Sequence, residues 1–206
     1  MAARRIPKKD DIEQAAMELF ARRGFAGTTI KEIAAQAGVT EGALYRHYSS
    51  KEEMASSLFE RELGLIQERL AESLSVSGSA GHKLRQVISY LYSSYEREPW
   101  PLLFVILNFQ NLQGDSRLDD KKHIYDYIIE YVRELLSDSE TGPQPASFVS
   151  QSSEGVEIDY EFLATLIAGL VIQPIIFHYY EKLKRHPVQY VDEITLSCCR
   201  LTGLEI

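Results

Sequence analysis

Apolar side chains recur at intervals of three and four residues along most of the 206-residue chain, which is the spacing of amphipathic α-helices. The first such segment runs from about Lys8 or Asp10 to Arg23 and is expected to stop at Gly24. Its apolar face is formed by Ile12, Ala15, Ala16, Leu19 and Phe20. No stretch in which polar and apolar residues alternate competes with this pattern. The chain is therefore expected to be all-α, with about nine helices.

A pair of short helices joined by a glycine turn is predicted for residues 28–51. The Thr29 hydroxyl can accept a hydrogen bond from the amide of Glu32 while the Glu32 carboxylate reaches back, a capping box that begins the first helix. Gly38 ends this helix, because the chain leaves it in a left-handed conformation that a side chain would strain. Thr40 can cap the second helix. A helix-turn-helix of this kind projects its second helix as a probe, which points to DNA binding rather than to catalysis.

The outward face of the second helix, expected at Glu41–Tyr48, is nearly bare at Gly42 and Ala43. Glycine inside a helix costs roughly 0.5–1 kcal/mol relative to alanine, but a bare face lets the backbone approach the wall of a DNA major groove. Hydrogen-bond donors that can reach phosphate oxygens surround this face: Thr29, Thr40, Tyr45, His47 and Lys51. A carboxylate can accept from cytosine, a methyl can touch thymine and a guanidinium can grip guanine. Base contacts are therefore expected from Thr40, Glu41, Ala43 and Arg46.

Capped helix pairs with a glycine turn also occur as simple packing motifs in helical proteins. The residues AMELFARRGFAGTTI and IAAQAGVTEGALYRHYSSKEEM, however, resemble the DNA-binding domain of the TetR (tetracycline repressor) family of transcriptional regulators, from about Ile12 to Lys51. This resemblance implies an all-helical homodimer that binds a palindromic operator in double-stranded DNA. It implies an N-terminal helix-turn-helix DNA-binding domain at residues 1–51. A C-terminal domain at residues 52–206 would bind a small-molecule effector, dimerise and release the DNA.

The C-terminal domain is expected to be built from further helices. Apolar residues line up in two neighbouring rows from Lys51 to about Ser75, so one long helix is expected to join the two domains. The other helices are expected at about His82–Arg97, Pro101–Gln113, Leu118–Ser137, Asp159–Arg185 and Pro187–Leu201. A stretch rich in Ser, Gly and Pro at Ser137–Gly155 is interpreted as a long mobile loop.

The segment Asp159–Arg185 is the most apolar in the chain, with apolar residues almost all round its middle, so it must be buried on several sides. A face for a partner helix is offered by Leu166, Gly169, Leu170 and Gln173. The last helix adds Val191, Ile194, Leu196 and Leu201. The resemblance implies that these two helices of each subunit form a four-helix seam in the homodimer. A wholly internal core helix is the alternative interpretation.

Aromatic residues are frequent in the C-terminal domain, and aromatic walls with a few polar tips line small-molecule pockets as well as ordinary helical cores. Polar residues within apolar runs discriminate better, because Asn108, Gln173 and His178 would each need a partner if buried. The effector pocket is expected to be bounded by Tyr92, Trp100, Phe104, Asn108, Tyr125, Gln173 and Phe177. Such a pocket would accept a largely apolar or aromatic compound that carries one or two hydrogen-bonding groups.

Charge is distributed unevenly between the two predicted domains. Residues 1–51 contain 9 Lys and Arg against 6 Asp and Glu, a net charge of +3, whereas the rest contain 13 against 24, a net charge of −11. This asymmetry favours approach of the first domain to phosphates while the second is repelled; an acidic surface that only aids solubility is the alternative. The basic residues in MAARRIPKKD form either an arm that follows DNA or a disordered tail.

Other classes of function find little support in the sequence. His123 and His178 lack metal-ligand spacing, and the adjacent Cys198 and Cys199 fit neither a disulfide framework nor a C-x-x-C motif, so no metal or cofactor is expected. The chain has no Walker loop, G-x-S-x-G, H-E-x-x-H or glycine fingerprint after a strand, and is not expected to be an enzyme. Neither an apolar run of about 18 residues nor a signal peptide is found, so a cytoplasmic location is expected. A helical protein-binding scaffold is the alternative function, but it gives no reason for the bare face at Gly42.

Overall fold

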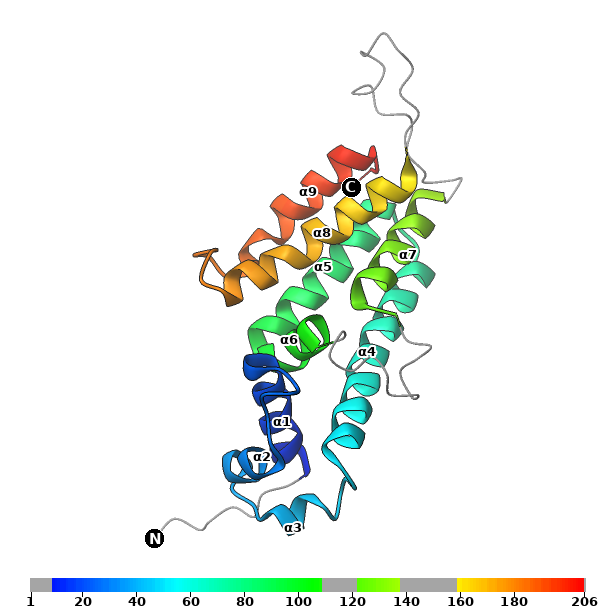
Figure 1. Ribbon diagram of the computed structural model, residues 1–206. Coiled ribbons are helices and arrows are strands. Elements are labelled where there is room, and N and C mark those ends of the chain that lie inside the picture. Colours follow the sequence, from blue (N-terminus) through cyan, green and yellow to red (C-terminus); the bar gives the residue numbers. More distant parts are fainter. Residues whose placement is uncertain (1–8, 109–121, 138–158, 206) are drawn as a thin grey trace. The chain divides into compact units, whose positions relative to one another are not determined.

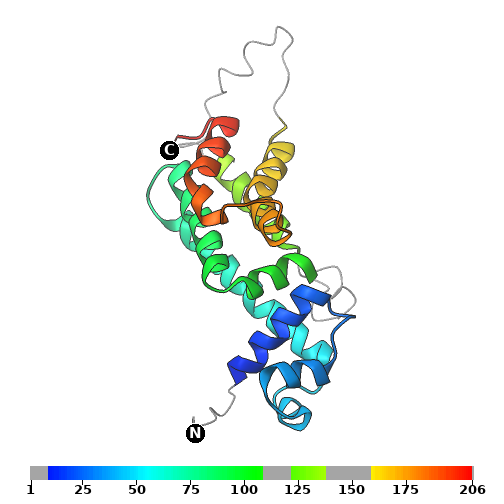
Figure 2. The ribbon, with the colours of Figure 1, turned by 90° about the vertical axis from the view of Figure 1, so that its left-hand side faces the viewer.

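A computed structural model describes residues 9–108, 122–137 and 159–205 of the chain (Figures 1 and 2). All regular structure in these ranges is helical, which confirms the predicted all-α class and the number of helices. The α-helices are α1 (Lys9–Arg23), α2 (Ile30–Ala37), α3 (Glu41–Leu44), α4 (Lys51–Ser75), α5 (Ala80–Arg97), α6 (Pro99–Asn108), α7 (Ile124–Ser137), α8 (Tyr160–Tyr179) and α9 (Val191–Thr202). A 3-10 helix, η2 (Pro187–Tyr190), precedes α9.

The chain packs into two compact units whose boundary falls inside α4, between Leu65 and Ile66. The first unit contains α1, α2, α3, the beginning of α4 and also α6. The second contains the end of α4 together with α5, α7, α8, η2 and α9. The packing unit at the N-terminus therefore extends past Lys51, and a functional boundary at that residue stays a prediction.

The core of the first unit forms where α6 lies against α1 (Figure 2). Phe104 of α6 is fully buried, and its ring centre lies 5.5 Å from that of Phe20 in α1 and 6.1 Å from that of Phe59 in α4. Burying one such side chain contributes about 1.5–3 kcal/mol. The Arg22 guanidinium lies 4.6 Å from the ring centre of Trp100, a cation–π contact between the same two helices. The helix α6 is thus a structural part of the unit that holds the helix-turn-helix.

The core of the second unit is formed by α5, α7, α8 and α9, and α8 contacts both α7 and α9 (Figure 1). Tyr92 of α5 is fully buried and donates a 2.9 Å hydrogen bond to the carbonyl oxygen of Val171, so its hydroxyl is satisfied. The Ser73 hydroxyl donates to the carbonyl oxygen of Lys83 at 3.0 Å and lies 2.9 Å from the hydroxyl of Tyr131. The end of α4 is therefore tied to α5 and α7. The buried face of α8 consists of Ala164, Ile167, Ala168, Val171, Ile172 and Ile175.

The expectation that no apolar run is long enough to cross a membrane is wrong for α8. Glu161–Tyr179 spans 19 residues with a mean hydropathy of 1.8, sufficient in length and composition for a membrane span. Polar residues such as Gln173 interrupt the run without lowering its mean hydropathy enough to exclude it. The core helix of a packed unit has the same composition, and Ile167 and Val171 are fully buried against neighbouring helices.

The helix that follows the glycine turn is shorter than the sequence predicts. It was expected to reach Tyr48, but α3 ends at Leu44. The N–H of His47 donates to the carbonyl oxygen of Leu44 at 2.9 Å, only three residues back, which tightens the chain into a turn. The exposed surface of this segment is therefore one helical turn followed by a tight turn.

The C-terminal end of α8 also differs from the prediction. This helix was expected to continue to Arg185, but it ends at Tyr179. Glu181 has a left-handed φ of 58°, and the N–H groups of Lys182 and Leu183 both donate to the carbonyl oxygen of Phe177. These bonds satisfy the end of the helix and turn the chain away from it.

The helix α7 begins at Ile124, not at Leu118, because residues 122–123 are not helical. The N–H of His123 donates to the Asp126 carboxylate at 2.8 Å, and the amide of Asp126 donates back to the carbonyl oxygen of His123 at 2.9 Å. Several expectations lie outside the described residues: the basic arm at residues 1–8, the extension of α6 to Gln113 and the loop that follows Ser137.

Candidate DNA-binding surface

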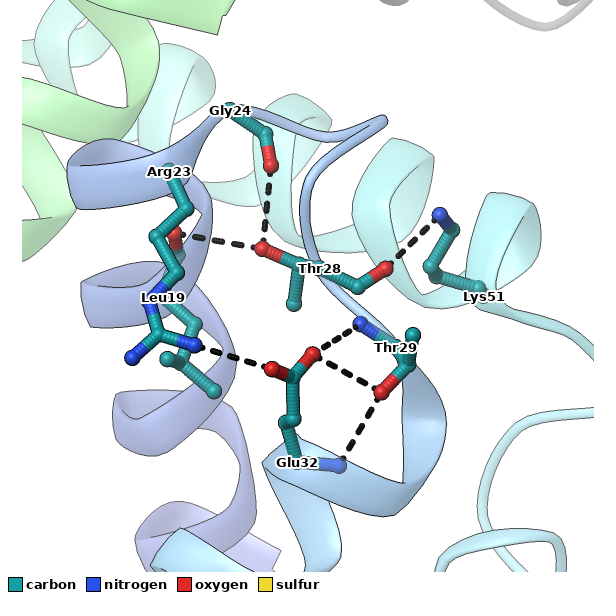
Figure 3. Close-up of polar contacts among 7 residues, drawn as sticks. All are labelled: Leu19, Arg23, Gly24, Thr28, Thr29, Glu32 and Lys51. Atoms are coloured by element: carbon teal, nitrogen blue, oxygen red, sulfur yellow. Dashed lines mark hydrogen bonds and ion pairs between the residues drawn. The ribbon is translucent and has the colours of Figure 1, made fainter.

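The predicted capping box at the start of α2 is present (Figure 3). The Thr29 hydroxyl oxygen accepts from the amide of Glu32 at 3.3 Å, and the Glu32 carboxylate accepts from the Thr29 N–H at 2.9 Å. Arg23 of α1 donates to the other carboxylate oxygen at 2.9 Å. The hydrogen bonds from Thr29, together with the Arg23 charge, hold the pKa of Glu32 below its usual value. One carboxylate thus begins α2 and ties it to α1.

The turn between α2 and α3 has the geometry that the sequence predicts. Gly38 has φ 70° and ψ 30°, a left-handed conformation in which a side chain would be strained. The N–H of Val39 donates to the carbonyl oxygen of Ala34 at 2.9 Å, and the N–H of Gly38 donates to that of Ala35 at 3.2 Å. These bonds close the end of α2 and redirect the chain into α3.

The orientation of α3 follows from its cap and from two buried side chains. The Thr40 hydroxyl accepts from the amide of Ala43 at 3.2 Å, which confirms the predicted cap. Leu44 and Tyr48 are buried, at 0% and 6% exposure. Because these two side chains point inward, the residues between and before them face solvent.

The outward face of α3 is open. Nothing lies within 4 Å of the position that a Cβ of Gly42 would occupy. Tyr45 is 51% exposed, and Ala43 and Lys51 are half-buried. The remaining candidate DNA contacts are all exposed, namely Thr29, Thr40, Glu41, Gly42, Arg46 and His47. The fold therefore brings most of the predicted contact residues to the surface around one helical turn.

Two residues that were expected to contact phosphate already have partners within the protein. The Lys51 ammonium donates to the carbonyl oxygens of Phe25 and Thr28, both at 2.9 Å, and lies 4.1 Å from the ring centre of Phe25. The Thr29 hydroxyl donates to the Glu32 carboxylate at 2.8 Å. An ammonium group has three N–H donors, so one N–H of Lys51 is left for a phosphate. The phosphate role of both residues stays a prediction. The structural role of Thr29 was expected from its capping box, whereas that of Lys51 was not indicated by the sequence.

A buried carboxylate behind α3 was missed in the sequence. Glu13 of α1 is 4% exposed, and it accepts hydrogen bonds from the Tyr48 hydroxyl and from Arg61 of α4. Lys9 lies 3.3 Å from the same carboxylate. Burial raises the pKa of Glu13, but the hydrogen bonds from Tyr48 and Arg61 and the Arg61 charge outweigh it, so the pKa lies below its usual value. The available signal was an acidic residue adjoining Ile12 on the apolar face of the first helix.

The hydroxyl of Tyr48 belongs to the same cluster. Burial and the neighbouring Glu13 carboxylate raise the pKa of Tyr48, so its hydroxyl keeps its proton and remains a donor across the physiological range. Arg61 also donates to the carboxylate of Glu62, at 2.7 and 2.9 Å. Carboxylates, a guanidinium and a phenol therefore satisfy one another in the polar layer that joins α1, α4 and the end of the α3 segment.

The seven candidate effector contacts are divided between the two compact units. Trp100, Phe104 and Asn108 lie in α6 of the first unit, whereas Tyr92, Tyr125, Gln173 and Phe177 lie in the second. In the second unit, the Gln173 amide lies 3.5 Å from the Tyr125 hydroxyl, while Tyr92 is fully buried and Phe177 is 51% exposed. In the first, both polar side-chain atoms of Asn108 are buried without a hydrogen-bond partner among the described atoms. Their common role in a pocket stays a prediction.

The remaining histidines and cysteines pack against other side chains. The hydroxyl of Tyr95 lies 3.0 Å from Nδ1 of His178, and the ring of His123 stacks on that of Tyr125. Cys198 and Cys199 are free and buried, and burial raises the pKa of Cys198 to about 12. In the part of the chain that the structure describes, no group of three or more His, Cys, Asp or Glu is placed to hold a metal ion.

Comparison with known proteins places the helix-turn-helix in a family. Residues 12–58 match the model for bacterial regulatory proteins of the tetR family. A fatty acid metabolism regulator protein of Bacillus subtilis is 37% identical over 87 residues, which cover 42% of this chain and 45% of that protein. The HTH-type transcriptional repressor KstR2 of Mycolicibacterium smegmatis is 32% identical over 89 residues, 43% of each chain. The chain thus spans less than half the length of these relatives.

A solved structure resembles the fold over nearly its whole length. The transcriptional regulator FadR from Bacillus subtilis, in complex with stearoyl-CoA, superposes with a TM-score of 0.64 at 23% identity, over 96% of this chain and 100% of that one. At this identity the likeness concerns the fold alone. Together, the two comparisons show a helix-turn-helix of the tetR family type at residues 12–58 and a fold like that of FadR over nearly the whole chain.

Proposed function

We propose that the protein is a transcriptional regulator, a repressor that binds a palindromic DNA operator as a homodimer and is released by a small molecule. The open face of α3 carries this proposal. The backbone at Gly42 has open space before it, and exposed Glu41 and Arg46 adjoin it. A bare helical turn ringed by polar side chains can lie against base edges in the major groove, where a recognition helix docks.

The contacts are assigned by chemistry. Thr29, Tyr45, His47 and the remaining N–H of Lys51 are proposed to meet phosphates, which fix the register of the protein on the duplex. Thr40 is proposed to contact phosphate or a base, and bases are proposed to be read by Glu41, Ala43 and Arg46. The net charge of +3 on residues 1–51 favours this approach. A site on chromosomal DNA accords with a location in the cytoplasm.

The homodimer is proposed to form through α8 and α9. Phe162, Leu166 and Leu170 are 60%, 43% and 37% exposed, and their spacing places them on one face of α8. Leu201 of α9 is 52% exposed. Contiguous apolar surface of this kind is uncommon on monomers and marks an interface. A two-fold dimer would present two copies of α3, which is why a palindromic operator is proposed.

The effector is proposed to be a largely apolar or aromatic molecule, and long-chain acyl-CoA thioesters are the first class to test. The similar protein of Bacillus subtilis is a fatty acid metabolism regulator protein, and the similar solved structure, FadR from Bacillus subtilis, is a complex with stearoyl-CoA. The proposed contacts are the seven residues expected from the sequence, namely Tyr92, Trp100, Phe104, Asn108, Tyr125, Gln173 and Phe177. Asn108 supports a polar contact, since leaving a buried amide without a partner costs free energy that a ligand's hydrogen bond would offset.

Selection of bound duplexes from random DNA tests the proposal. The expected result is one palindromic sequence, bound by a dimer with an affinity that falls steeply as salt is raised. Stearoyl-CoA and shorter acyl thioesters are then titrated into the complex, with free coenzyme A as the control, and release by the long acyl chain alone is expected. A protein that enriches no sequence, and binds duplexes equally at moderate salt, is a helical scaffold instead.

A further inference from the structure

The segment that is proposed to read DNA has little helical structure of its own. The helix α3 comprises only Glu41–Leu44, and after it the amides of His47 and Tyr48 both bond to the carbonyl oxygen of Leu44, at 2.9 and 3.2 Å. A single helical turn is not stable alone in water, because helix nucleation is unfavourable. The direction in which residues 45–47 face must therefore be set by contacts outside the segment.

Two side chains anchor the segment, and they differ in what they can specify. Leu44 is fully buried, but an apolar contact is non-directional and defines orientation loosely. The hydroxyl of Tyr48 donates to Oε1 of Glu13, 35 residues earlier in α1. A hydrogen bond depends on both distance and angle, so this contact restrains the end of the segment in position and direction.

Glu13 in turn is held by other elements. Arg61 of α4 donates to its second oxygen, Oε2, and Lys9 lies 3.3 Å from Oε1. Tyr48, Arg61 and Lys9 all donate, so both side-chain oxygens of Glu13 must be able to accept. A glutamine at this position would turn an NH₂ group toward one of the donors. The carboxylate is therefore specific to its place between α1, α4 and the α3 segment.

We infer that Glu13 is a positioning residue for sequence-specific DNA recognition: by holding the Tyr48 hydroxyl against α1 and α4, it sets the direction in which α3 and residues 45–47 face. This inference rests on the proposed function. Base contacts need directed hydrogen bonds, whereas non-specific binding depends mainly on the number of phosphates neutralised. Loss of the tie therefore weakens specific binding and leaves non-specific binding almost unchanged.

The test uses the full chain with Glu13→Gln, Tyr48→Phe and the double variant. Glu68→Gln, which removes an exposed carboxylate of α4, is the matched control. Dissociation constants are measured for the selected operator and for a scrambled duplex of equal length over a range of salt. Each single variant is expected to bind the operator at least about tenfold more weakly and the scrambled duplex within about twofold, with the same salt slope. The double variant is expected to bind the operator no more weakly than Glu13→Gln alone, because Tyr48→Phe removes only the Tyr48 contact, which Glu13→Gln has already disturbed.

Amide hydrogen exchange supplies a readout that does not depend on DNA. In Tyr48→Phe, which keeps the buried ring, the amides of residues 45, 47 and 48 are expected to exchange several-fold faster. The amides of Ile33 in α2 and of Val39 in the turn that follows it are expected to keep their rates. Faster exchange at the first three alone supports a local tie.

The outcomes separate the inference from the function on which it rests. If Tyr48→Phe keeps both its exchange rates and its ratio of operator to scrambled affinity, the inference is wrong. Equal loss of operator and scrambled binding in Tyr48→Phe also overturns it, because Glu13 would then support the fold in general. A wild-type protein that prefers no duplex removes the proposed function instead, and hydrogen exchange alone then decides whether Glu13 orients the segment.

Discussion

The ammonium group of Lys51 lies 2.9 Å from the carbonyl oxygen of Thr28, so the first turn of α4 is bound to the chain that joins α1 and α2 (Figure 3). The carbonyl oxygen of Phe25 accepts from the same ammonium group at 2.9 Å. The Lys51 side chain was expected only to contact DNA, but it also holds the start of α4 against the segment between α1 and α2. Its two roles are separable by experiment, because one acts on stability and the other on affinity.

Replacing Lys51 by methionine is expected to lower the free energy of unfolding by about 1–3 kcal/mol. The substitution keeps the aliphatic stem beside Phe25 but leaves two carbonyl oxygens without their charged donor. Urea unfolding at neutral pH measures the change. Lys31→Met, which removes an exposed ammonium group from α2, is the control and is expected to stay within about 0.5 kcal/mol of the wild type. A Lys51→Met protein as stable as the control would show that these contacts contribute nothing.

The same variant tests the proposed phosphate contact. If the third N–H of Lys51 meets a phosphate, Lys51→Met should weaken binding to all duplexes alike and lower the slope of log K against log salt by about one unit. Titrations at several salt concentrations, at a temperature where the variant is folded, measure this slope. An unchanged slope with an altered sequence preference would rule out the phosphate contact.

Two glycines in the helix-turn-helix are expected to respond to substitution in opposite ways. Gly42 has open space at its Cβ position, so Gly42→Leu should leave stability equal or higher but abolish operator binding by filling the face of α3. Gly38 has φ 70°, so Gly38→Ala should cost about 1–2 kcal/mol of stability. Thermal unfolding and operator titration of both proteins check these expectations. Unfolding of Gly42→Leu would show that the glycine is required by the fold.

The pH dependence of stability should report on Glu13. Its pKa lies below the usual value because hydrogen bonds from Tyr48 and Arg61 outweigh burial, which raises it. A carboxyl whose pKa is lowered on folding stabilises the fold above its unfolded pKa of about 4.3 and loses this contribution as pH falls through the folded value. The difference in unfolding free energy between wild type and Glu13→Gln should therefore be largest near pH 7 and shrink below about pH 4. Urea unfolding across this range measures it, and a constant difference would contradict the assignment.

The proposed dimer makes a prediction for the exposed face of α8. Leu166→Glu places a charge among exposed apolar side chains and should convert the protein to monomers with unchanged helix content. Leu65→Glu changes an exposed leucine of similar exposure on α4, 47% against 43%, and is expected to leave the dimer intact. Sedimentation velocity distinguishes the two. A dimer that survives Leu166→Glu would move the interface away from this face.

Features that depend on residues within one helical turn could be predicted from the sequence. The capping box of Thr29 and Glu32, the left-handed Gly38 and the Thr40 cap each involve atoms at most a few positions apart. Residue type and spacing are sufficient in such cases, because the partners are brought together by the helix itself. The bounds of α4 were predicted correctly for the same reason, since its apolar rows are continuous.

Features that join distant segments could not be predicted in this way. The tie from Tyr48 to Glu13 spans 35 residues, and the tie from Lys51 to Thr28 spans 23. The packing of Phe104 on Phe20, which brings α6 into the first unit, depends on how helices pair. Periodicity shows that a helix has an apolar face, but it does not show which other helix covers that face. The acidic Glu13 on the apolar face of the first helix was a local sign of one of these contacts.

The side chains that hold the α3 segment and those that face solvent are different residues. Leu44 and Tyr48 point inward, whereas Glu41, Arg46 and His47 are exposed. Surface substitutions away from caps and buried contacts usually change stability by less than about 0.5 kcal/mol. A duplicated gene for this protein could therefore change the chemistry of this surface one residue at a time, with a folded protein at every step.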